Sequence, residues 1–393
     1  MRVLYVTGMY PNPTYPQKGI FCHEQVKALQ KAGVEVTVVV PVVFYDREVK
    51  VKTWEYEGVK IRYIKFFKLP GTRDFHKTGK SLFRKLDKKL DLKSFDVYHA
   101  DAPLPAGMAV MQASKKYGVP FVVHGHGLDV FLDKSYEGAK NCDKIAATCQ
   151  LVYEQANAVI GVSQKVLDRI QKRVDVSKKG YVVYNGVDTD AFVPIEKEKT
   201  DVFMISSVGN LIPLKGHKYL LHALQIAVEK GYHNLKCVIA GRGYLEEELK
   251  ELAADLGLQD YVDFKGYIPY SEIVSLMQNS DVFILPSYYE AIGCVYLEAM
   301  ACGVPAVGCR KNGIDEVIID GENGYLVDNH NIEQIVDCLI ALQDEKKCIE
   351  MGKAARKTVV ENYTWKNSAE ILIKAYSNLL DIKGLLTYGI KNN

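Results

Sequence analysis

The stretch of sequence that most constrains the fold covers residues 281–307. It begins with an apolar run, 281–286, that is short enough to form a fully buried strand. Good helix formers follow over 294–301, and Gly303 and Pro305 then stop that helix before a second apolar run begins. A buried strand, a loop, a helix and another buried strand in this order predict an α/β fold.

The same alternation of short apolar strands and helices continues through the whole chain. In the first half, strands are predicted at 3–7, 36–40, 61–66, 97–99, 121–124, 158–162 and 181–184, with helices between them, for example at 21–32, 106–117 and 164–173. In the second half, strands are predicted at 203–208, 236–240, 262–266, 282–285 and 306–308, and closing helices at 332–343, 349–361 and 368–380. This order predicts doubly wound parallel sheets, in which ligands bind at the carboxyl ends of the strands.

The length of 393 residues is too great for a single hydrophobic core, so we expect two domains. A turn-rich segment at 185–194, followed by a polar one at 196–200, separates the two sets of strands. We therefore expect a Rossmann-like domain over 1–190, a second one over 200–365, and a C-terminal helix in 366–393.

The composition is that of an ordinary globular protein, with 48% hydrophobic residues, 25% charged residues and a formal net charge of +2. These values exclude a disordered chain and, by bulk charge, a nucleic-acid-binding protein. Nine cysteines, an odd number without C-x-x-C spacing, indicate free thiols in a reducing compartment. The first apolar segment is too short for a secretory signal, and the longest apolar run, 36–45, is too short to span a bilayer. We therefore expect a cytoplasmic protein.

Two acids flank the predicted helix start in the 281–307 stretch. Glu290 should lie in the loop at the carboxyl end of the strand, and Glu298 on the helix that follows. The free backbone amides of the helix N-terminus lie between them and favour a phosphate. This arrangement suits a nucleotide-sugar, whose sugar and ribose hydroxyls would each meet one carboxylate. The alternative is a solvated Glu298 and an ordinary loop acid at Glu290.

Both acids belong to a block, E-x-x-G-x-x-x-x-E-A-M-A-x-G-x-P, that resembles the signature of retaining glycosyltransferases of family four. The resemblance implies the GT-B fold, in which two Rossmann-like domains face a cleft and the last helix crosses back to the first domain. It also implies a nucleotide-sugar donor, a UDP-sugar by default, and a hexose-type sugar. The expected acceptor is a glycan or a lipid-linked acceptor, in exopolysaccharide, teichuronic-acid-like or lipopolysaccharide synthesis.

The resemblance also implies roles for the residues of this block. Glu290 would position the sugar, and Glu298 would bind the ribose. Ile292, Gly293 and Cys294, at the start of the helix, would also contact the donor. The block departs from the family pattern at Ile292, where an aromatic residue is common.

A second motif follows the first strand of the second domain and ends in Lys215 and Gly216. A lysine in such a loop can neutralise a diphosphate leaving group as a point charge, although surface lysines without a role are common. The motif resembles the family pattern G-R-L-x-x-x-K-G, in which Lys215 matches the lysine. Asn210 replaces the phosphate-binding arginine, and Arg242 in a neighbouring loop is a candidate for the missing charge; a solvated loop arginine is the alternative.

The base of the nucleotide has two further candidate contacts. The resemblance to the family implies that Tyr267 and Ile268, which follow the strand 262–266, lie beside the base. The loop that contains Gly313 resembles the family's G-G-x-P-E loop, with Asn312 in place of the first glycine.

The first domain supplies the remaining candidates. Gly19, in the loop that opens the first helix, would let the backbone approach a phosphate or sugar of the donor, and a ligand-free turn is the alternative. His126 and Asp129 resemble the family's H-G-x-D motif, so His126 is a catalytic and acceptor-side candidate and Asp129 an acceptor-side one. Asp101, at the end of another strand, is a further acceptor-side candidate, whereas His99 and His124 are assigned to packing.

No metal ion or other cofactor is expected. The spacing of His124, His126 and Asp129 could suit a metal, but no further ligand cluster accompanies it in the sequence. Asp188 and Asp190 form a D-x-D pair, but they lie in a turn where local backbone bonding explains acidic residues. The resemblance implies front-face displacement without a protein nucleophile, in which the departing diphosphate accepts the proton of the acceptor.

A basic segment in the first domain is a candidate membrane contact. Between Lys60 and Lys93 there are 12 basic residues, opposed only by Asp74, Asp87 and Asp91. Leucines recur every fourth residue over 81–92, which predicts a basic amphipathic helix. We expect it to contact an anionic membrane surface reversibly, as a peripheral protein; a core-facing leucine stripe with a solvated basic back is the alternative.

The sequence also allows two other functions. One is a different nucleotide-sugar enzyme on the same fold, which would need its own base pair or cofactor lysine. The other is a non-catalytic GT-B partner subunit whose phosphate site has lapsed, as Asn210 would allow.

Overall fold

The computed structural model describes residues 1–69, 75–127, 129–131, 142–197 and 200–391, which form two α/β units. The first unit contains Met1–Asn185 and Trp365–Asn393, and the second contains Gly186–Thr364. Arg73 and Asp74 of the basic segment, residues 198–199 of the predicted linker and residues 392–393 of the predicted terminal helix lie outside the described part.

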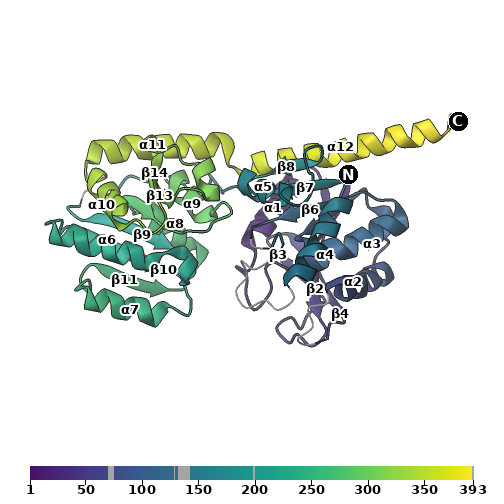
Figure 1. The fold of residues 1–393 in the computed structure, drawn as a ribbon, viewed down its shortest axis with the longest axis horizontal. Helices are drawn as coiled ribbons and strands as arrows, with labels where there is room; N and C mark the ends of the chain where they lie inside the picture. Colours follow the sequence, from purple (N-terminus) through teal and green to yellow (C-terminus); the bar gives the residue numbers. More distant parts are fainter. Residues whose placement is uncertain (70–74, 128, 132–141, 198–199, 392–393) are drawn as a thin grey trace. The chain divides into compact units, whose positions relative to one another are not determined.

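The first unit is built on an eight-stranded sheet (Figure 1). Its strands are β1 (Arg2–Thr7), β2 (Glu35–Val43), β3 (Thr53–Tyr56), β4 (Val59–Phe66), β5 (Val97–Asp101), β6 (Phe121–Gly125), β7 (Ala158–Gly161) and β8 (Gly180–Val182). They lie in the order β3-β4-β2-β1-β5-β6-β7-β8, and all pairs are parallel except β3 with β4 at the edge. In the middle of the sheet, Val3 of β1 is paired with Val36 of β2 and with Val97 of β5.

Helices cover this sheet in two groups. The helices are α1 (Ile20–Lys31), α2 (Phe75–Lys89), α3 (Met108–Tyr117), α4 (Cys142–Gln155), α5 (Gln164–Gln171) and α12 (Trp365–Lys391), with short turns η1 (Leu92–Ser94) and η2 (Pro103–Gly107). Helices α1 and α12 pack together, and α2, α3 and α4 form the other group. Strands covered in this way are buried throughout, as β5 and β6 are.

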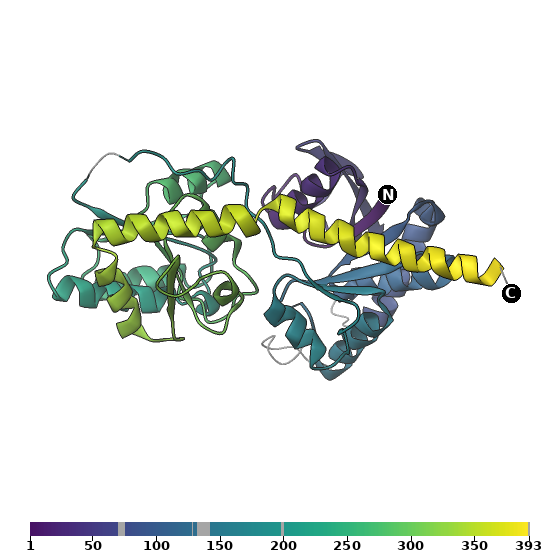
Figure 2. The same cartoon turned by 90° about the horizontal axis from the view of Figure 1, so that it is seen from above.

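Helix α12 is part of the first unit's core, although it is the last element of the chain. It runs along this unit (Figure 2) and buries Leu372 and Tyr376 completely. The Tyr376 hydroxyl is hydrogen-bonded to Nδ1 of His99 on β5, at 2.6 Å, and Gln25 of α1 donates to Ser368 at 3.4 Å. These contacts connect the C-terminal helix to strand β5 and helix α1.

The second unit is built on a six-stranded parallel sheet. Its strands are β9 (Phe203–Val208), β10 (Leu235–Ala240), β11 (Val262–Gly266), β12 (Val282–Ile284), β13 (Ala306–Cys309) and β14 (Gly324–Val327). Its helices are α6 (His217–Glu229), α7 (Glu246–Asp255), α8 (Tyr270–Gln278), α9 (Cys294–Ala301), α10 (Ile332–Ala341) and α11 (Glu345–Asn362), with turns η3 (Pro213–Lys215) and η4 (Gly313–Glu316). The strand order is β11-β10-β9-β12-β13-β14, so the direction of winding reverses between β9 and β12.

The two units therefore have the doubly wound α/β architecture that the sequence predicts, apart from the antiparallel edge strand β3. The helix predicted at 81–92 is wrong in its bounds, because α2 covers Phe75–Lys89 and a separate turn begins at Leu92. Leu82 and Leu86 of α2 are completely buried. The leucine stripe therefore faces the core, and only the basic side of α2 is exposed.

Candidate functional site

The second unit brings Lys215 and Glu290 together at the point where its sheet changes winding direction. Lys215 lies after β9, and Glu290 lies after β12, the strand beside it. Crevices for ligands form at such points, because the two following loops leave the sheet in opposite directions. Nζ of Lys215 and Oε1 of Glu290 form an ion pair, with side chains 19% and 9% exposed. A cation and an anion that the sequence separates by 75 positions thus form one site.

Backbone contacts hold these two loops against each other. Gly216 has a φ of +71° and packs so closely that a Cβ there would lie 2.2 Å from the carbonyl oxygen of Pro286. The backbone N–H of Tyr288 donates to the carbonyl of Leu214 at 3.0 Å. The position of the Lys215 backbone is therefore coupled to that of the Glu290 loop.

Asn312 supports the Glu290 loop from the other side, a role that the sequence does not predict. Its side chain accepts a hydrogen bond from the backbone N–H of Glu290 at 3.1 Å and donates to the carbonyl of Ser287 at 2.8 Å. The backbone N–H of Gly313 also donates to the carbonyl of Glu290, at 2.9 Å. The glycine of the family pattern could not make these side-chain bonds, so the replacement by asparagine stabilises the loop. The only sequence signal is this departure itself.

Glu298 lies on α9, which starts directly after Gly293. Burial raises the pKa of the Glu298 carboxyl to about 7. Of the other candidates in this block, Ile292 is buried at 2% exposure and Cys294 is partly buried. Ile292 therefore shapes the loop from within, while the backbone at the start of α9 and the Glu298 carboxyl remain as polar groups for a ligand.

The remaining donor-side candidates lie on neighbouring loops of the same sheet edge. Asn210 is exposed in the loop after β9, and Arg242 lies in the loop after β10. The two loops are joined by a hydrogen bond from the Leu211 N–H to the Arg242 carbonyl, at 2.9 Å. The Arg242 guanidinium lies 5.3 Å from the ring centroid of Tyr267, which follows β11; Ile268, the next residue, is partly buried.

The first unit has a comparable site at its own change of winding, between β1 and β5. Gly19 precedes α1 with a φ of +65°, and a Cβ there would lie 2.3 Å from the Met9 carbonyl group, so only glycine fits. Asp101 ends β5 and has a side chain that is 1% exposed. Loops from strands distant in sequence therefore meet here as well.

Asp101, Cys22, His126 and Asp129 form one hydrogen-bonded group in the first unit. Oδ2 of Asp101 accepts a hydrogen bond from the Cys22 thiol of α1 at 2.7 Å. Oδ1 of Asp101 contacts Nε2 of His126, which follows β6. The Asp129 carboxylate accepts a hydrogen bond from the backbone N–H of His126 at 2.9 Å. The three acceptor-side candidates are thus in contact, and Cys22 joins them without having been predicted from the sequence.

The charges of this group depend on one another. Burial alone would raise the pKa of Asp101, but the His126 imidazole outweighs it and the pKa falls well below its ordinary value. Burial alone would lower the pKa of His126, but Asp101 outweighs it and the pKa rises. Burial lowers the pKa of the adjacent His124 well below its usual range and that of His99 to about 4. An ion pair of Asp101 and His126 is therefore surrounded by neutral histidines near neutral pH.

The same group has the spacing of a metal site. Ligand atoms of Cys22, Asp101 and His126 lie within 4.8 Å of one another, and so do those of His99, Asp101 and His124. Thiolate, carboxylate and imidazole groups together suit zinc. In this structure, Oδ2 of Asp101 faces the Cys22 thiol and Oδ1 faces the His126 ring, so each oxygen of this carboxylate has a protein partner.

Asp188 and Asp190, by contrast, lie in a turn. The Asp188 side chain accepts hydrogen bonds from the backbone N–H groups of Asp190 and Ala191, at 3.0 and 3.1 Å. Local backbone bonding therefore accounts for Asp188, as the sequence predicts.

Comparison with known proteins gives matches to both halves of the chain. Residues 19–191 match the model described as Glycosyltransferase Family 4, and residues 188–358 match the model described as Glycosyl transferases group 1. An uncharacterized glycosyltransferase of Methanocaldococcus jannaschii is 28% identical over 98% of this chain and 100% of its own length. A D-inositol 3-phosphate glycosyltransferase of Corynebacterium jeikeium is 30% identical over 73% of each chain. A putative teichuronic acid biosynthesis glycosyltransferase of Bacillus subtilis is 26% identical over 83% of this chain and 85% of its own.

Solved structures share the fold at lower sequence identity. Sucrose-phosphate synthase from Thermosynechococcus elongatus has a TM-score of 0.80 and 17% identity, covering 97% of this chain and 99% of that one. The Anabaena protein HepE, in complex with UDP and glucose, has a TM-score of 0.74 and 18% identity, covering 96% and 100%. The two halves of this chain match the two models in order, and the relative from Corynebacterium jeikeium is 30% identical over 73% of each chain. This chain therefore belongs to the GT-B glycosyltransferases that join a Glycosyltransferase Family 4 half to a glycosyl transferases group 1 half.

Proposed function

We propose that this protein is a retaining glycosyltransferase that moves a hexose-type sugar from a nucleotide-sugar, with a UDP-sugar as default donor, to a glycan or lipid-linked acceptor. The observation that carries the proposal is the Lys215–Glu290 ion pair at the winding change of the second sheet, next to the start of α9. A diphosphate needs a cation and free amides, and a sugar needs an acceptor for its hydroxyls. These groups are side by side here.

In the proposed reaction, Lys215 offsets the negative charge that grows on the leaving diphosphate. Glu290 then accepts hydrogen bonds from the sugar hydroxyls, and Glu298 accepts them from the ribose. Lys215 already faces Glu290 before the donor binds, so the donor would enter between two groups that are held in place. The proposed displacement takes place on the front face of the sugar and uses no metal ion and no protein nucleophile.

A place in cell-surface polysaccharide synthesis is supported by the similarity to the putative teichuronic acid biosynthesis glycosyltransferase of Bacillus subtilis. The UDP and glucose bound to the Anabaena protein support a UDP-sugar as the first donor to test. We propose that the protein acts in the cytoplasm, where nucleotide-sugars are the expected donors.

We also propose that the first unit docks on an anionic membrane surface beside a lipid-linked acceptor. Six exposed basic residues lie on the outer side of α2: Lys77, Lys80, Arg84, Lys85, Lys88 and Lys89. Asp87, the acid within this helix, is paired with Lys116 at 2.7 Å. Among the described residues, no helix combines the length and the apolar character needed to cross a bilayer, so the proposed contact is peripheral.

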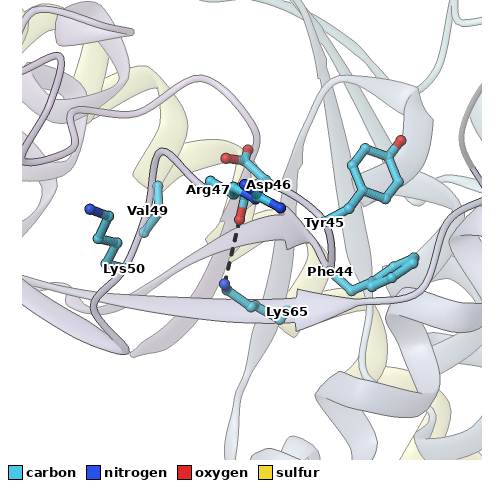
Figure 3. Close-up of a pocket in the computed structure, with 7 residues that line it drawn as sticks. All are labelled: Phe44, Tyr45, Asp46, Arg47, Val49, Lys50 and Lys65. Atoms are coloured by element: carbon cyan, nitrogen blue, oxygen red, sulfur yellow. Dashed lines mark hydrogen bonds between the residues drawn. The ribbon is translucent and has the colours of Figure 1, made fainter.

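We propose that exposed aromatic rings that follow β2 and β4 in the same unit give this docking surface an apolar component. Phe44, Tyr45 and Phe67 are 47%, 41% and 52% exposed, and the Phe44 ring stacks on Phe67 at 5.1 Å. A hollow of about 460 Å³ adjoins these rings and is lined by Phe44, Tyr45, Asp46, Arg47, Val49, Lys50 and Lys65. Figure 3 shows how these lining residues lie. Exposed aromatic rings beside cations suit the interface of an anionic leaflet, where rings enter the headgroup region and cations meet phosphates.

The first prediction concerns the donor and the metal. Incubation with a panel of nucleotide-sugars should give slow release of the nucleoside diphosphate from one of them, and a chelator should leave the rate unchanged. The measurement is chromatography of the released nucleotide. Activity that is lost with the chelator and restored only by manganese or magnesium would contradict metal independence, and no hydrolysis of any donor would favour a non-catalytic protein.

The second prediction separates the two acids. Glu298→Gln should weaken binding of UDP alone by about 1.5–3 kcal/mol, since ribose hydroxyls lose a charged acceptor. Glu290→Gln should leave UDP affinity nearly intact and reduce affinity or turnover for the whole donor. Titration calorimetry with UDP and with the intact donor distinguishes the two. Equal losses of UDP affinity in both variants would refute this division of roles.

The pH dependence gives a third prediction about Glu298. Its pKa is raised to about 7, so the free protein must lose a proton before the charged carboxylate can bind the ribose. UDP affinity should therefore rise with pH up to about 7 and then level off, falling up to about tenfold for each pH unit below 7. Dividing the wild-type affinity by the Glu298→Gln affinity at each pH cancels the effect of the titration of UDP itself. A ratio that stays constant from pH 5.5 to 8 would show that the charge of Glu298 is not used.

The fourth prediction concerns the missing arginine. We propose that Arg242 supplies the charge that Asn210 lacks, because their loops are hydrogen-bonded to each other. Arg242→Ala should then weaken UDP binding about tenfold or more, as expected for a lost charged hydrogen bond. Asn210→Arg should have little effect alone and should restore binding to Arg242→Ala. Lys218→Ala, which removes a cation from α6, is the matched control. If Asn210→Arg alone tightens UDP binding, no other residue supplies the charge of the missing arginine. If neither Arg242→Ala nor Asn210→Arg changes UDP binding, the diphosphate binds elsewhere.

The fifth prediction tests the docking surface. Wild-type protein should sediment with vesicles that contain anionic phosphatidylglycerol, and not with neutral phosphatidylcholine vesicles. Changing Lys85, Lys88 and Lys89 to Glu should reduce the affinity at least about a hundredfold, since each basic group contributes about 1 kcal/mol. The control changes three exposed lysines of the second unit to Glu: Lys346, Lys353 and Lys357. Phe44→Ser with Phe67→Ser tests the aromatic part. If the wild type ignores anionic vesicles at low salt, a soluble acceptor becomes the better proposal.

A further inference from the structure

The contacts of Asp101 and His126 distinguish the roles of these two residues, which the sequence motif alone does not. Asp101 is buried at the end of β5, and its two oxygens face the Cys22 thiol and Nε2 of His126. It is therefore enclosed by protein groups and is in a poor position to meet an acceptor itself. The His126 side chain is 17% exposed, and its other ring nitrogen, Nδ1, has no hydrogen-bond partner among the described residues.

We propose that Asp101 is a positioning residue, which fixes the His126 ring through Nε2 and keeps it an imidazolium whose Nδ1–H donates to an oxygen of the bound substrate. This assignment rests on the proposed transferase function only for the identity of the substrate. The state of the ring in the free protein does not depend on it.

The geometry leaves one orientation for the ring. A carboxylate only accepts hydrogen bonds, so the nitrogen that faces Oδ1 of Asp101 must carry a proton. The backbone N–H of His126 is held by Asp129 at 2.9 Å, and the ring stacks on His124 at a centroid distance of 4.4 Å. The ring is thus fixed at its backbone, at one face and at Nε2. Polar atoms that are buried generally have a partner, and Nδ1 is the atom of this ring that still lacks one among the described residues.

Burial of Asp101 explains why the ring carries a charge. An ionised carboxylate away from water is costly unless a cation accompanies it. The Cys22 thiol is neutral, because burial and the nearby Asp101 raise its pKa well above the ordinary value. His124 and His99, which burial keeps neutral, supply no charge either. Within the described part of the chain, His126 is the group in contact with Asp101 that is suited to balance it, and its own pKa is raised accordingly.

The titratable groups around the His126 ring come from four parts of the first unit. They are Asp101 and His99 of β5, Cys22 of α1, His124 of β6, and Asp129 of the loop after β6. Both acids favour the charged ring, and the other three groups are neutral near pH 7. An imidazolium has no lone pair for a proton, so His126 in this state acts as a hydrogen-bond donor and not as a general base.

The direct test is the titration of His126 in the free protein by NMR with ¹³C,¹⁵N-labelled histidine, its signal being assigned with His126→Gln. In the wild type, the midpoint should lie above the ordinary histidine value of about 6.5. In Asp101→Asn it should fall by about 1–3 pH units, as expected when an opposite charge in contact is removed. Cys22→Ser is the matched control, because a hydroxyl can still donate to Oδ2, and its midpoint should stay within about half a pH unit.

Turnover supplies a second readout that a merely structural role would not produce. In the wild type, turnover should remain constant while the ring is charged, whereas Asp101→Asn should lose activity as the pH rises through its lower midpoint. A general base would give the reverse, with activity rising as the ring loses its proton. If the protein lacks transferase activity, the NMR titration still decides the assignment.

Three outcomes would overturn the assignment. One is a wild-type midpoint at or below about 6.5. Another is a His126 midpoint that is the same in Asp101→Asn as in the wild type, when circular dichroism shows that the variant is folded. If the variant does not fold, the wild-type midpoint alone decides. The third is one zinc ion per chain in the purified protein, by mass spectrometry, that Cys22→Ala removes, because a metal would then hold the ring in place of the proton.

Discussion

Parallel strands covered on both faces constrain where this protein can do chemistry. A ligand can reach only the ends of such a strand, so functional residues must lie on the loops that follow it. In the first sheet the winding changes between β1 and β5, and in the second between β9 and β12. Gly19 and Asp101 lie at the first of these places, and Lys215 and Glu290 lie at the second. The motifs of the sequence are therefore placed by sheet topology.

Each of these places contains one anion and one cation in contact. In the second unit the pair is Glu290 with Lys215, and in the first it is Asp101 with His126. A partly or fully buried ion pair is seldom more stable than apolar side chains of the same volume, because both charges lose their hydration. Stability therefore does not explain the pairs. Charges held in place before the ligand arrives are what binding of a phosphate or a hydroxyl requires.

Neutral contacts hold these charges in position. Asn312 bonds the backbone on both sides of the Glu290 loop, and Gly216 lets the Lys215 loop pack against Pro286. In the first unit, Asp129 holds the backbone of His126 and the Cys22 thiol holds the far oxygen of Asp101. The residues that contact a substrate thus depend on others that do not, and whose sequence signals are weak.

The sequence by itself determined the α/β class and most strands, because a buried strand appears as a short local run of apolar residues. The strands predicted at 203–208 and 262–266 coincide with β9 and β11. It did not reveal β3 or β14, since these four-residue strands are short and β3 alternates exposed and half-buried residues. Only the tertiary structure decided that Asn312 supports Glu290, that the leucines of α2 face the core, and that Asp101 pairs with His126 and Cys22. These contacts join residues that are far apart in the chain, or choose between the two sides of a helix. Strand order and tertiary packing decide both, because a local pattern such as the leucine stripe of α2 marks an apolar side without specifying its partner.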